Sequence, residues 1–359
     1  MTDRRRVDPA RCFEDQRLSQ PTGRDVTSIG SEQPAVEHLA ILVVYFLSSQ
    51  DDQAILELHC DRVQQHTQVP YTLYAATQRC SESTQAYISA QPNVVIVDLE
   101  PTTQRGSREH GHYLDGLLEA AMHGPASHIC TLDVDSFPIT DVWVATLANA
   151  LDAASGLCGI FRAENGDTAL AHPSCIFGTR AFFEQFKPTF APMHASGTDA
   201  RRFRRATGQS PDTGIDLVGK LWMARLGWGR VSRTNRVDPH YLMAGIYGDC
   251  VFHLGGLSRG KVFRRDLRRS LPHRLSRPLE RVPNSPAWLG SVKKALLRRV
   301  RSGAVSRIAA QNRDVYVLLR EWLLRDPDGL FAYLQGSGPT ADDARAKELA
   351  KVNCTKRPR

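Results

Sequence analysis

The sequence HICTLDVDSFPI at residues 128–139 is the stretch that decides the fold. Its apolar first half predicts a strand buried on both faces of an α/β sheet, and Pro138 ends the run. Asp133 and Asp135 come at the carboxyl-terminal tip, where open α/β sheets bind ligands. Residues two positions apart on an extended strand face the same way, so we predict adjacent carboxylates. A divalent cation would relieve their repulsion and could also bind a diphosphate, because hard cations take carboxylate and phosphate oxygens together.

Alternating strand and helix patterns precede this stretch. Continuous apolar runs at 40–47, 71–76 and 94–99 predict strands, and helical spacing of apolar residues at 54–65 predicts a helix between the first two. This order predicts an α/β fold with a mostly parallel mixed sheet flanked by helices. The sequence contains neither GxGxxG nor GxxxxGK[ST], so the usual backbone cradles for nucleotides are absent. A nucleotide would therefore need another anchor, and a metal is the simplest one.

Later patterns divide the chain into parts. The stretch 191–209 is irregular and rich in arginine, which predicts a mobile surface loop, and 305–334 has amphipathic helical spacing. We predict a disordered tail at 1–37, an α/β domain at 38–262, a basic segment at 263–304, C-terminal helices at 305–340 and a frayed tail at 341–359.

The charge of the chain is concentrated in one region. The 359 residues carry a net charge of +8, whereas the segment 259–307 alone holds 15 basic and two acidic residues. Such a segment suits anionic partners such as phosphates or an acidic membrane surface, and a solvated basic surface is the alternative. The eight cysteines are scattered without a CxxC pair, which favours a reducing, cytoplasmic setting over zinc or disulfide frameworks. We expect neither a signal peptide nor a membrane-spanning helix.

The segment 132–139, together with the loop 106–111, resembles the nucleotide-sugar-binding half of GT-A glycosyltransferases. It is most similar to the broad family 2 type, and the likeness covers roughly residues 39–260. The Asp-x-Asp motif is shared by many GT-A families, so it indicates the superfamily more firmly than a substrate. The resemblance implies a GT-A, Rossmann-like domain of a hexosyltransferase-type enzyme. Such an enzyme moves a sugar from a UDP- or GDP-sugar donor to an acceptor hydroxyl.

The resemblance also implies a metal site. In that fold the acid pair binds Mn²⁺ or Mg²⁺, with Asp135 as the direct ligand and Asp133 acting through water or on the ribose or donor sugar. A late histidine often completes the site, and His253 stands in that place before two glycines. A neutral imidazole is a good ligand for Mn²⁺. The alternatives are acids that cap a turn and a histidine packed in the sheet.

A base that deprotonates the acceptor is expected at a helix start after the acceptor-side strands. Asp212 fits that place, and Asp216 lies one turn further on. The family's commoner Glu-Asp pair is replaced here by Pro211 and Asp212, which leaves the base open. Asp is also a favoured helix N-cap, so a structural role is the alternative. Inversion is the predicted outcome if Asp212 is the base, and retention is the alternative.

Five further residues are candidates for donor contacts. Tyr45 and Ser48 stand at the tip of the first strand, where the nucleobase and ribose usually bind, and Asp98 ends the third strand. His110 lies in the loop that enters the helix before the motif, and Arg259 could bind the diphosphate. The alternatives are core packing for Tyr45, a turn for Asp98, a helix-start position for His110 and a solvated charge for Arg259.

Two other functions remain open from the residues alone. The first is a non-catalytic α/β protein that binds nucleic acid or a membrane surface through its basic segment. Recognisable nucleic-acid modules and interleaved aromatic residues are absent from that segment, so we expect no nucleic-acid partner. The second is a nucleotidyltransferase, which would need a glycine-rich basic loop where the sequence has SSQDD at 48–52. We therefore predict a cytoplasmic glycosyltransferase, with peripheral contact to an anionic membrane and an acceptor that the sequence does not name.

Overall fold

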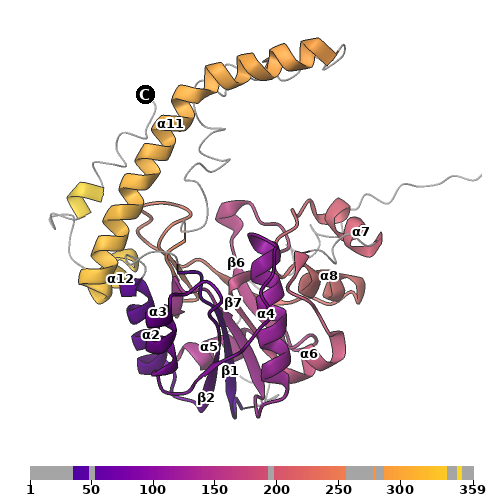
Figure 1. Ribbon diagram of the computed structural model, residues 1–359, viewed down its shortest axis with the longest axis vertical. Coiled ribbons are helices and arrows are strands. Elements are labelled where there is room, and N and C mark those ends of the chain that lie inside the picture. Colours follow the sequence, from indigo (N-terminus) through magenta and orange to yellow (C-terminus); the bar gives the residue numbers. More distant parts are fainter. Residues whose placement is uncertain are drawn as a thin grey trace, which may run out of the picture.

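A computed structural model describes residues 35–47, 53–192, 198–255, 278–279, 287–337 and 346–349. The predicted tail at 1–37 lies almost wholly outside these residues, as does most of the predicted tail at 341–359. The described chain forms a layered α/β body from which one long helix projects (Figure 1).

The main sheet has seven strands in the order β3-β2-β1-β4-β7-β6-β8. The first four are parallel neighbours, β7 runs antiparallel to both β4 and β6, and β8 is parallel to β6. The predicted mostly parallel mixed sheet is therefore confirmed. In spatial order, the strands are Val94–Ile96, Tyr71–Ala76, Leu39–Val44, His128–Leu132, His172–Thr179, Leu157–Phe161 and Gly229–Ser232.

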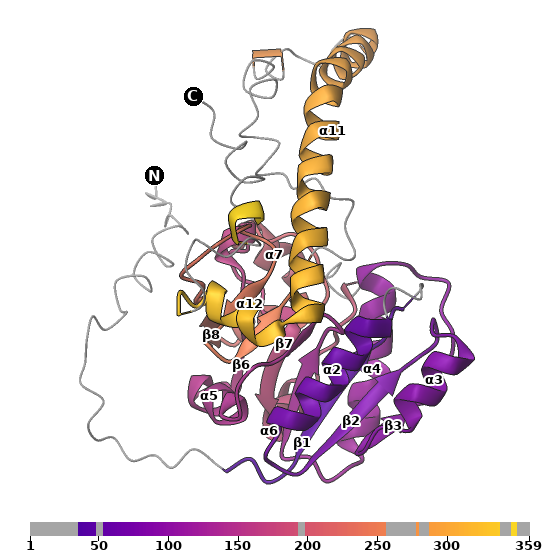
Figure 2. The same ribbon diagram turned by 90° about the vertical axis from the view of Figure 1, so that its left-hand side faces the viewer.

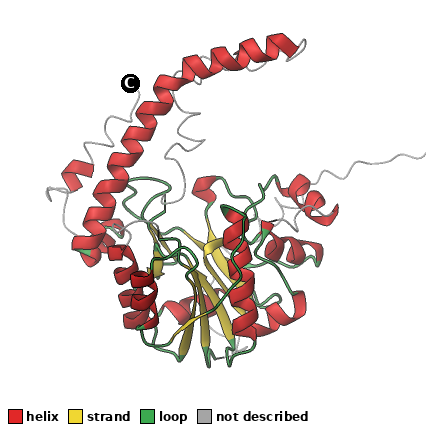
Figure 3. Ribbon diagram, viewed as in Figure 1, coloured by secondary structure: helices red, strands yellow, loops and turns green. Residues whose placement is uncertain are grey.

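Helices cover both faces of this sheet, as Figure 3 shows. Strand β1 explains why, because its alternate side chains enter two separate cores. Leu39, Ile41 and Val43 join one cluster, with α2 (Gln53–His66) and α5 (Trp143–Ala150). Ala40, Leu42 and Val44 join the other, with the three helices α4 (Ser107–Met122), α6 (Arg180–Phe186) and α8 (Ile215–Met223). A strand buried on both faces needs the continuous apolar run that the sequence shows.

A second, three-stranded antiparallel sheet lies beyond the carboxyl end of β4. Its order is β5 (Ser136–Pro138), β10 (Val251–His253) and β9 (Gly245–Tyr247). The sequence pattern did not predict β8 or β9. Strand β10 is important for function because its register sets His253 opposite Ser136, one residue after the acid pair.

The structure corrects the predicted single strand through the acid pair. Strand β4 ends at Leu132, and a tight turn follows, closed by a hydrogen bond of 2.8 Å from the Ser136 N–H to the Asp133 carbonyl. Strand β5 begins only after this turn. The two carboxylates therefore converge through a turn and not through strand alternation.

The arginine-rich stretch predicted as a loop also contains a helix, α7 (Thr198–Thr207). Among the described side chains of this helix, Phe203 is the buried apolar one. Its ring packs edge-on against the Trp222 ring of α8, with 5.8 Å between the ring centroids. A helix anchored by a single aromatic residue leaves little hydrophobic period in the sequence, so it was missed.

The predicted C-terminal helical extension is confirmed. Helix α11 (Ala287–Arg325) begins inside the segment predicted as basic and continues to α12 (Pro327–Leu334). Its carboxyl-terminal part packs on α2 and α12, and its amino-terminal part extends away from the body (Figures 1 and 2). None of the helices in the described part of the chain combines the length and apolar character that crossing a bilayer requires.

Candidate metal and donor site

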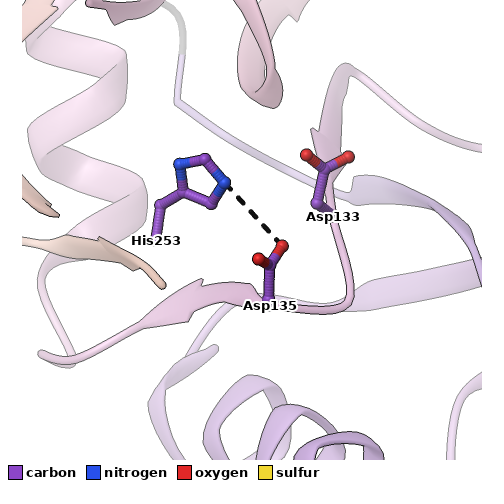
Figure 4. A group of neighbouring side chains, drawn as sticks. All are labelled: Asp133, Asp135 and His253. Atoms are coloured by element: carbon purple, nitrogen blue, oxygen red, sulfur yellow. Dashed lines mark ion pairs between the residues drawn. The ribbon is translucent and has the colours of Figure 1, made fainter. Parts of the chain in front are cut away.

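Three side chains predicted as metal ligands converge in the structure. Asp133 and Asp135 lie in the turn between β4 and β5, and His253 is the last residue of β10. One ligand atom from each lies within 4.8 Å of the others, and His253 Nε2 is 3.7 Å from Asp135 Oδ1 (Figure 4). The antiparallel pairing of β5 with β10 produces this convergence, because it brings together residues far apart in sequence.

Backbone groups fix the position of Asp135. Its carbonyl accepts a hydrogen bond from the Leu254 N–H at 2.8 Å, and its Oδ2 accepts one from the Gly255 N–H at 3.1 Å. Gly255 has a φ of +67°, and a Cβ there would approach the Leu242 carbonyl oxygen to 2.7 Å. Only glycine therefore fits this loop without strain, and the loop directs Oδ1 of Asp135 toward His253.

Burial governs the ionisation of the three groups. It raises the pKa of Asp135 to about 7, with a further increase from the charge of Asp133. Burial likewise raises the pKa of Asp133 to about 6, although the nearby positive charge of Arg162 opposes the effect. The pKa of His253 falls to about 3, first through burial and then through the charges of Arg162 and Arg233. The imidazole is thus neutral at physiological pH, whereas Asp135 is only partly ionised near pH 7 in the metal-free protein.

This donor set fits Mn²⁺ or Mg²⁺. Carboxylate oxygens suit both ions, and a neutral imidazole suits Mn²⁺ well. The three ligand atoms lie within 4.8 Å of one another, so modest side-chain rotations would bring all three onto one ion with bonds of about 2.1 Å. A divalent charge would also offset the cost of burying two carboxylates side by side.

Two further predicted residues lie beside the cluster. His110, in the first turn of α4, has its Nε2 3.5 Å from Asp133 Oδ1, and burial lowers its pKa to about 4. Asp212 acts electrostatically on both His110 and Asp133, which places it at the same site. The Ser107 hydroxyl donates to Asp212 Oδ1 at 2.6 Å, so the start of α4 holds the Asp212 carboxylate.

The remaining predicted residues are placed differently. The structure corrects Tyr45, whose ring has no exposed surface and packs edge-on against His59 in the core, so it cannot stack on a base. Asp98 is exposed beyond the end of β3, three strands from β4. Asp216 accepts from the Thr189 N–H at 3.1 Å and pairs with Lys220 at 3.4 Å, which indicates a structural role in α8. Ser48 and Arg259 lie outside the described residues.

The sequence reasoning missed Arg162, which directly follows β6. Its charge acts on both acids and on His253. The guanidinium Nε donates to Asp167 at 3.2 Å, whereas Nη2 is buried without a hydrogen-bond partner among the described residues. A charged residue at the end of an apolar strand was the available signal, and it is the same signal that identified the acid pair.

Two buried histidines support the cluster and were also missed. The His172 ring lies 5.5 Å from the His253 ring, and its Nδ1 is 2.7 Å from the Ser174 hydroxyl. His59 of α2 lies under the acid turn, and burial lowers its pKa to about 4 against the opposing effect of the Ser136 and Val134 carbonyls. Isolated histidines in sequence carry no signal for such positions.

Comparison with solved structures finds glycosyltransferases. The chain is similar to the mannosyltransferase PcManGT from Pyrobaculum calidifontis, solved with GDP-Man and Mn²⁺, at 14% identity and a TM-score of 0.39 over 98% of this chain and 95% of that one. It is also similar to mouse xyloside xylosyltransferase 1, at 14% identity and a TM-score of 0.34 over 53% of this chain and 82% of that one. A third similar structure is the galactosyltransferase LgtC with donor and acceptor sugar analogs, at 11% identity and a TM-score of 0.35 over 63% of this chain and 90% of that one.

No protein-family model matches the chain, and no curated protein matches it. The TM-scores given above all lie below 0.5, so these likenesses carry no conclusion about activity. The narrower likeness to family 2 stays a prediction. The case for a function rests on the side chains of this chain.

Proposed function

We propose that this protein is a divalent-metal-dependent glycosyltransferase that moves a sugar from a nucleoside-diphosphate-sugar to an acceptor hydroxyl. The observation that carries the proposal is the convergence of Asp133, Asp135 and His253 at the carboxyl end of β4. This place in an open α/β sheet binds ligands, and two carboxylates with a neutral imidazole would hold a Mn²⁺ or Mg²⁺ ion that also binds the diphosphate of the donor.

Asp133, Asp135 and His253 would hold the cation. When bound, the cation supplies Lewis-acid stabilisation of the negative charge that grows on the departing diphosphate. The protein adds Arg162, whose buried Nη2 offers a charge-assisted hydrogen bond to a phosphate oxygen. We assign Arg162 to the diphosphate because its buried Nη2 lacks a hydrogen-bond partner among the described residues, and a phosphate oxygen would supply one.

Asp212 is the proposed general base. The Ser107 hydroxyl and the Thr213 N–H both donate to its Oδ1, at 2.6 Å and 3.0 Å, and so fix the orientation of the carboxylate. In the proposed step the acceptor oxygen bonds to the anomeric carbon while the bond from that carbon to the diphosphate breaks. The acceptor proton passes to Asp212, and the diphosphate leaves with the bonding electron pair. Direct attack of this kind inverts the anomeric centre.

We also propose a cytoplasmic setting. The six cysteines in the described residues are all unpaired, including Cys130 and Cys175 with their sulfurs 3.9 Å apart. Neighbouring reduced thiols of this kind favour a reducing compartment.

The test is a thermal-stability titration with UDP- and GDP-sugars, GDP-mannose among them, with and without Mn²⁺. A ligand of the native state raises the melting temperature, so we expect at least one sugar nucleotide to do so only when Mn²⁺ is present. Asp135→Ala should lose the shift, whereas Asp61→Ala, which removes an exposed carboxylate on α2, should keep it. Equal behaviour of the parent and Asp135→Ala with every donor would refute the proposal. Salt-sensitive oligonucleotide binding without any Mn²⁺ effect would favour the non-catalytic alternative.

A further inference from the structure

An arginine-lined pocket opens beside the candidate base. Its walls come from α7 and from the chain that leads to Asp212, and the residues that line it are Arg201, Arg204, Arg205, Gln209, Ser210 and Pro211. The three arginines are spaced i, i+3 and i+4, so they share one face of α7. The opposite face carries Phe203, which anchors the helix in the core.

The electrostatics of this pocket call for an anion. Like charges at i and i+4 destabilise a helix, and three guanidinium groups on one face repel one another. Within the described side chains no carboxylate forms an ion pair with any of the three, and Arg204 Nε is buried without a hydrogen-bond partner there. A group with two negative charges would satisfy the buried donor and relieve the repulsion, and arginine matches phosphate geometry in particular.

Hydrogen bonds hold one lining residue of the pocket in place, and the lining chain leads directly to Asp212. Gln209 Oε1 accepts hydrogen bonds from the Thr168 N–H at 2.9 Å and the Ala169 N–H at 3.2 Å. Two residues later, Pro211 lines the pocket and is followed directly by Asp212, about 3.8 Å away between Cα atoms. A molecule held by the arginines could therefore present a hydroxyl to the Asp212 carboxylate.

We propose that this pocket binds a phosphate group of the acceptor. This inference rests on the proposed function, and it narrows the acceptor to phosphorylated molecules that also carry a hydroxyl. The cation cluster and Arg162 would bind the donor diphosphate on one side of Asp212, and α7 would bind the acceptor phosphate on the other.

Calorimetric titration with inorganic phosphate, in metal-free buffer with chelator, tests the pocket. The triple variant Arg201→Gln, Arg204→Gln, Arg205→Gln should bind phosphate at least about tenfold more weakly, because hydrogen bonds from charged groups are strong. Arg202→Gln on the same helix does not line the pocket and should bind like the parent. Equal phosphate affinity in the parent and the triple variant would overturn the inference, as would acetate binding as tightly as phosphate.

The two proposals fail in distinguishable ways. The triple arginine variant should keep the Mn²⁺-dependent thermal shift with sugar nucleotides. In the parent chain, saturating nucleotide should leave the affinity for phosphate unchanged. If the parent chain shows no Mn²⁺-dependent thermal shift with any sugar nucleotide, the proposed function is contradicted. Competition between phosphate and nucleotide for one site would contradict the pocket.

A different observation concerns the projecting half of α11. From 287 to 313 the sequence has seven basic and no acidic residues. Val292, Leu296 and Val300 lie four residues apart and are 55%, 46% and 43% exposed, so they form one apolar stripe. Lys293, half-buried, and Arg299, exposed, flank the stripe on its two sides, and Lys294 and Arg298 are exposed on the opposite face of the helix. In contrast, the other half of α11 is held in the core by buried residues such as Leu319 and Leu323.

We propose that this half of α11 docks on an anionic membrane surface, in the bilayer interface. An apolar stripe flanked by Lys and Arg on an otherwise soluble chain is the pattern of interfacial helices. Charge complementarity selects this occupant. A second copy of the helix would bring seven positive charges against seven, and nucleic acid would make no use of three aliphatic side chains.

Co-sedimentation of the full chain with vesicles tests this surface. The parent should bind phosphatidylcholine vesicles only when they contain phosphatidylserine. Replacing Lys293, Lys294, Arg298 and Arg299 by Gln should weaken binding at least about tenfold, since each basic side chain near an anionic surface contributes about fivefold. Replacing the three residues of the apolar stripe by Ser should weaken it too.

Val317→Ser serves as the matched control, because Val317 is exposed on the same helix but belongs to the half that packs on the body. It should bind vesicles like the parent. Equal binding to neutral and acidic vesicles, or retention of binding by either multiple variant, would overturn the proposal. A dimer in solution that the Ser variants convert to a monomer would assign the stripe to self-association instead.

Discussion

The acid pair should make the metal-free protein less stable as the pH rises, and Asp135→Asn should remove most of this effect. The pKa of Asp135 is about 7 in the folded chain against a reference of 3.8, because the carboxyl is buried beside Asp133. Between these values the folded state binds more protons than the unfolded state, so the free energy of unfolding falls as pH increases. At about 1.4 kcal/mol per unit, the interval from about pH 5 to 7 amounts to about 3 kcal/mol.

Asn at this position is uncharged at every pH, and its side-chain oxygen can still accept the Gly255 N–H. Denaturant unfolding of both chains in chelator, at about pH 5 and about pH 8, gives the comparison. We expect the free energy of unfolding of the Asn variant, relative to that of the parent, to increase by about 3 kcal/mol between about pH 5 and about pH 8. Asp61→Asn, at an exposed position, should show no such gain. The reasoning would be refuted if the stability difference between Asp135→Asn and the parent were the same at both pH values.

Three further predictions follow from the same site. Mn²⁺ affinity should rise from about pH 5 to 8 in calorimetric titrations, because protons must leave Asp133 and Asp135, whose pKa values are about 6 and 7. His253, with a pKa of about 3, is already neutral over this range. An affinity that falls as the pH rises would contradict this prediction. Asp212→Asn should reduce transfer on the order of 100-fold or more and leave the Mn²⁺-dependent donor shift intact, and full activity in this variant would exclude Asp212 as the base. Arg162→Gln should weaken binding of a nucleoside diphosphate about tenfold or more at about pH 8 without weakening the binding of Mn²⁺ alone, because the substitution removes a positive charge from beside the metal site; an equal loss of both would indicate that Arg162 only supports the fold.

Much of the fold was predictable because its signals are local. Buried strands need continuous apolar runs, and those runs located β1, β2 and β4 along the chain. The antiparallel β5–β10 pairing is a long-range contact, and no local pattern specifies it. Tyr45 was expected to contact the donor nucleotide because ligands bind at the tips of strands, and its buried ring does not support that expectation. It continues the side-chain alternation of Leu39, Ile41 and Val43 and joins the same core.

The candidate site shows the same division. Asp133 and Asp135 were identifiable because two acids that end an apolar strand are costly without a partner. His253 could be named only through a resemblance, since a lone histidine is ambiguous by itself. Arg162 depends on a buried environment that forms when distant segments meet, so its importance is visible only in three dimensions.

Electron paramagnetic resonance of Mn²⁺ tests the central claim most directly, because it counts free and bound ion without requiring the substrate. The parent chain should bind about one Mn²⁺ at this site, and UDP or GDP should tighten the binding. Both Asp135→Ala and His253→Ala should lose most of the bound signal. A parent chain that leaves all the Mn²⁺ free in the presence of either nucleotide, or variants that bind Mn²⁺ as the parent does, would contradict a metal centre formed by Asp133, Asp135 and His253.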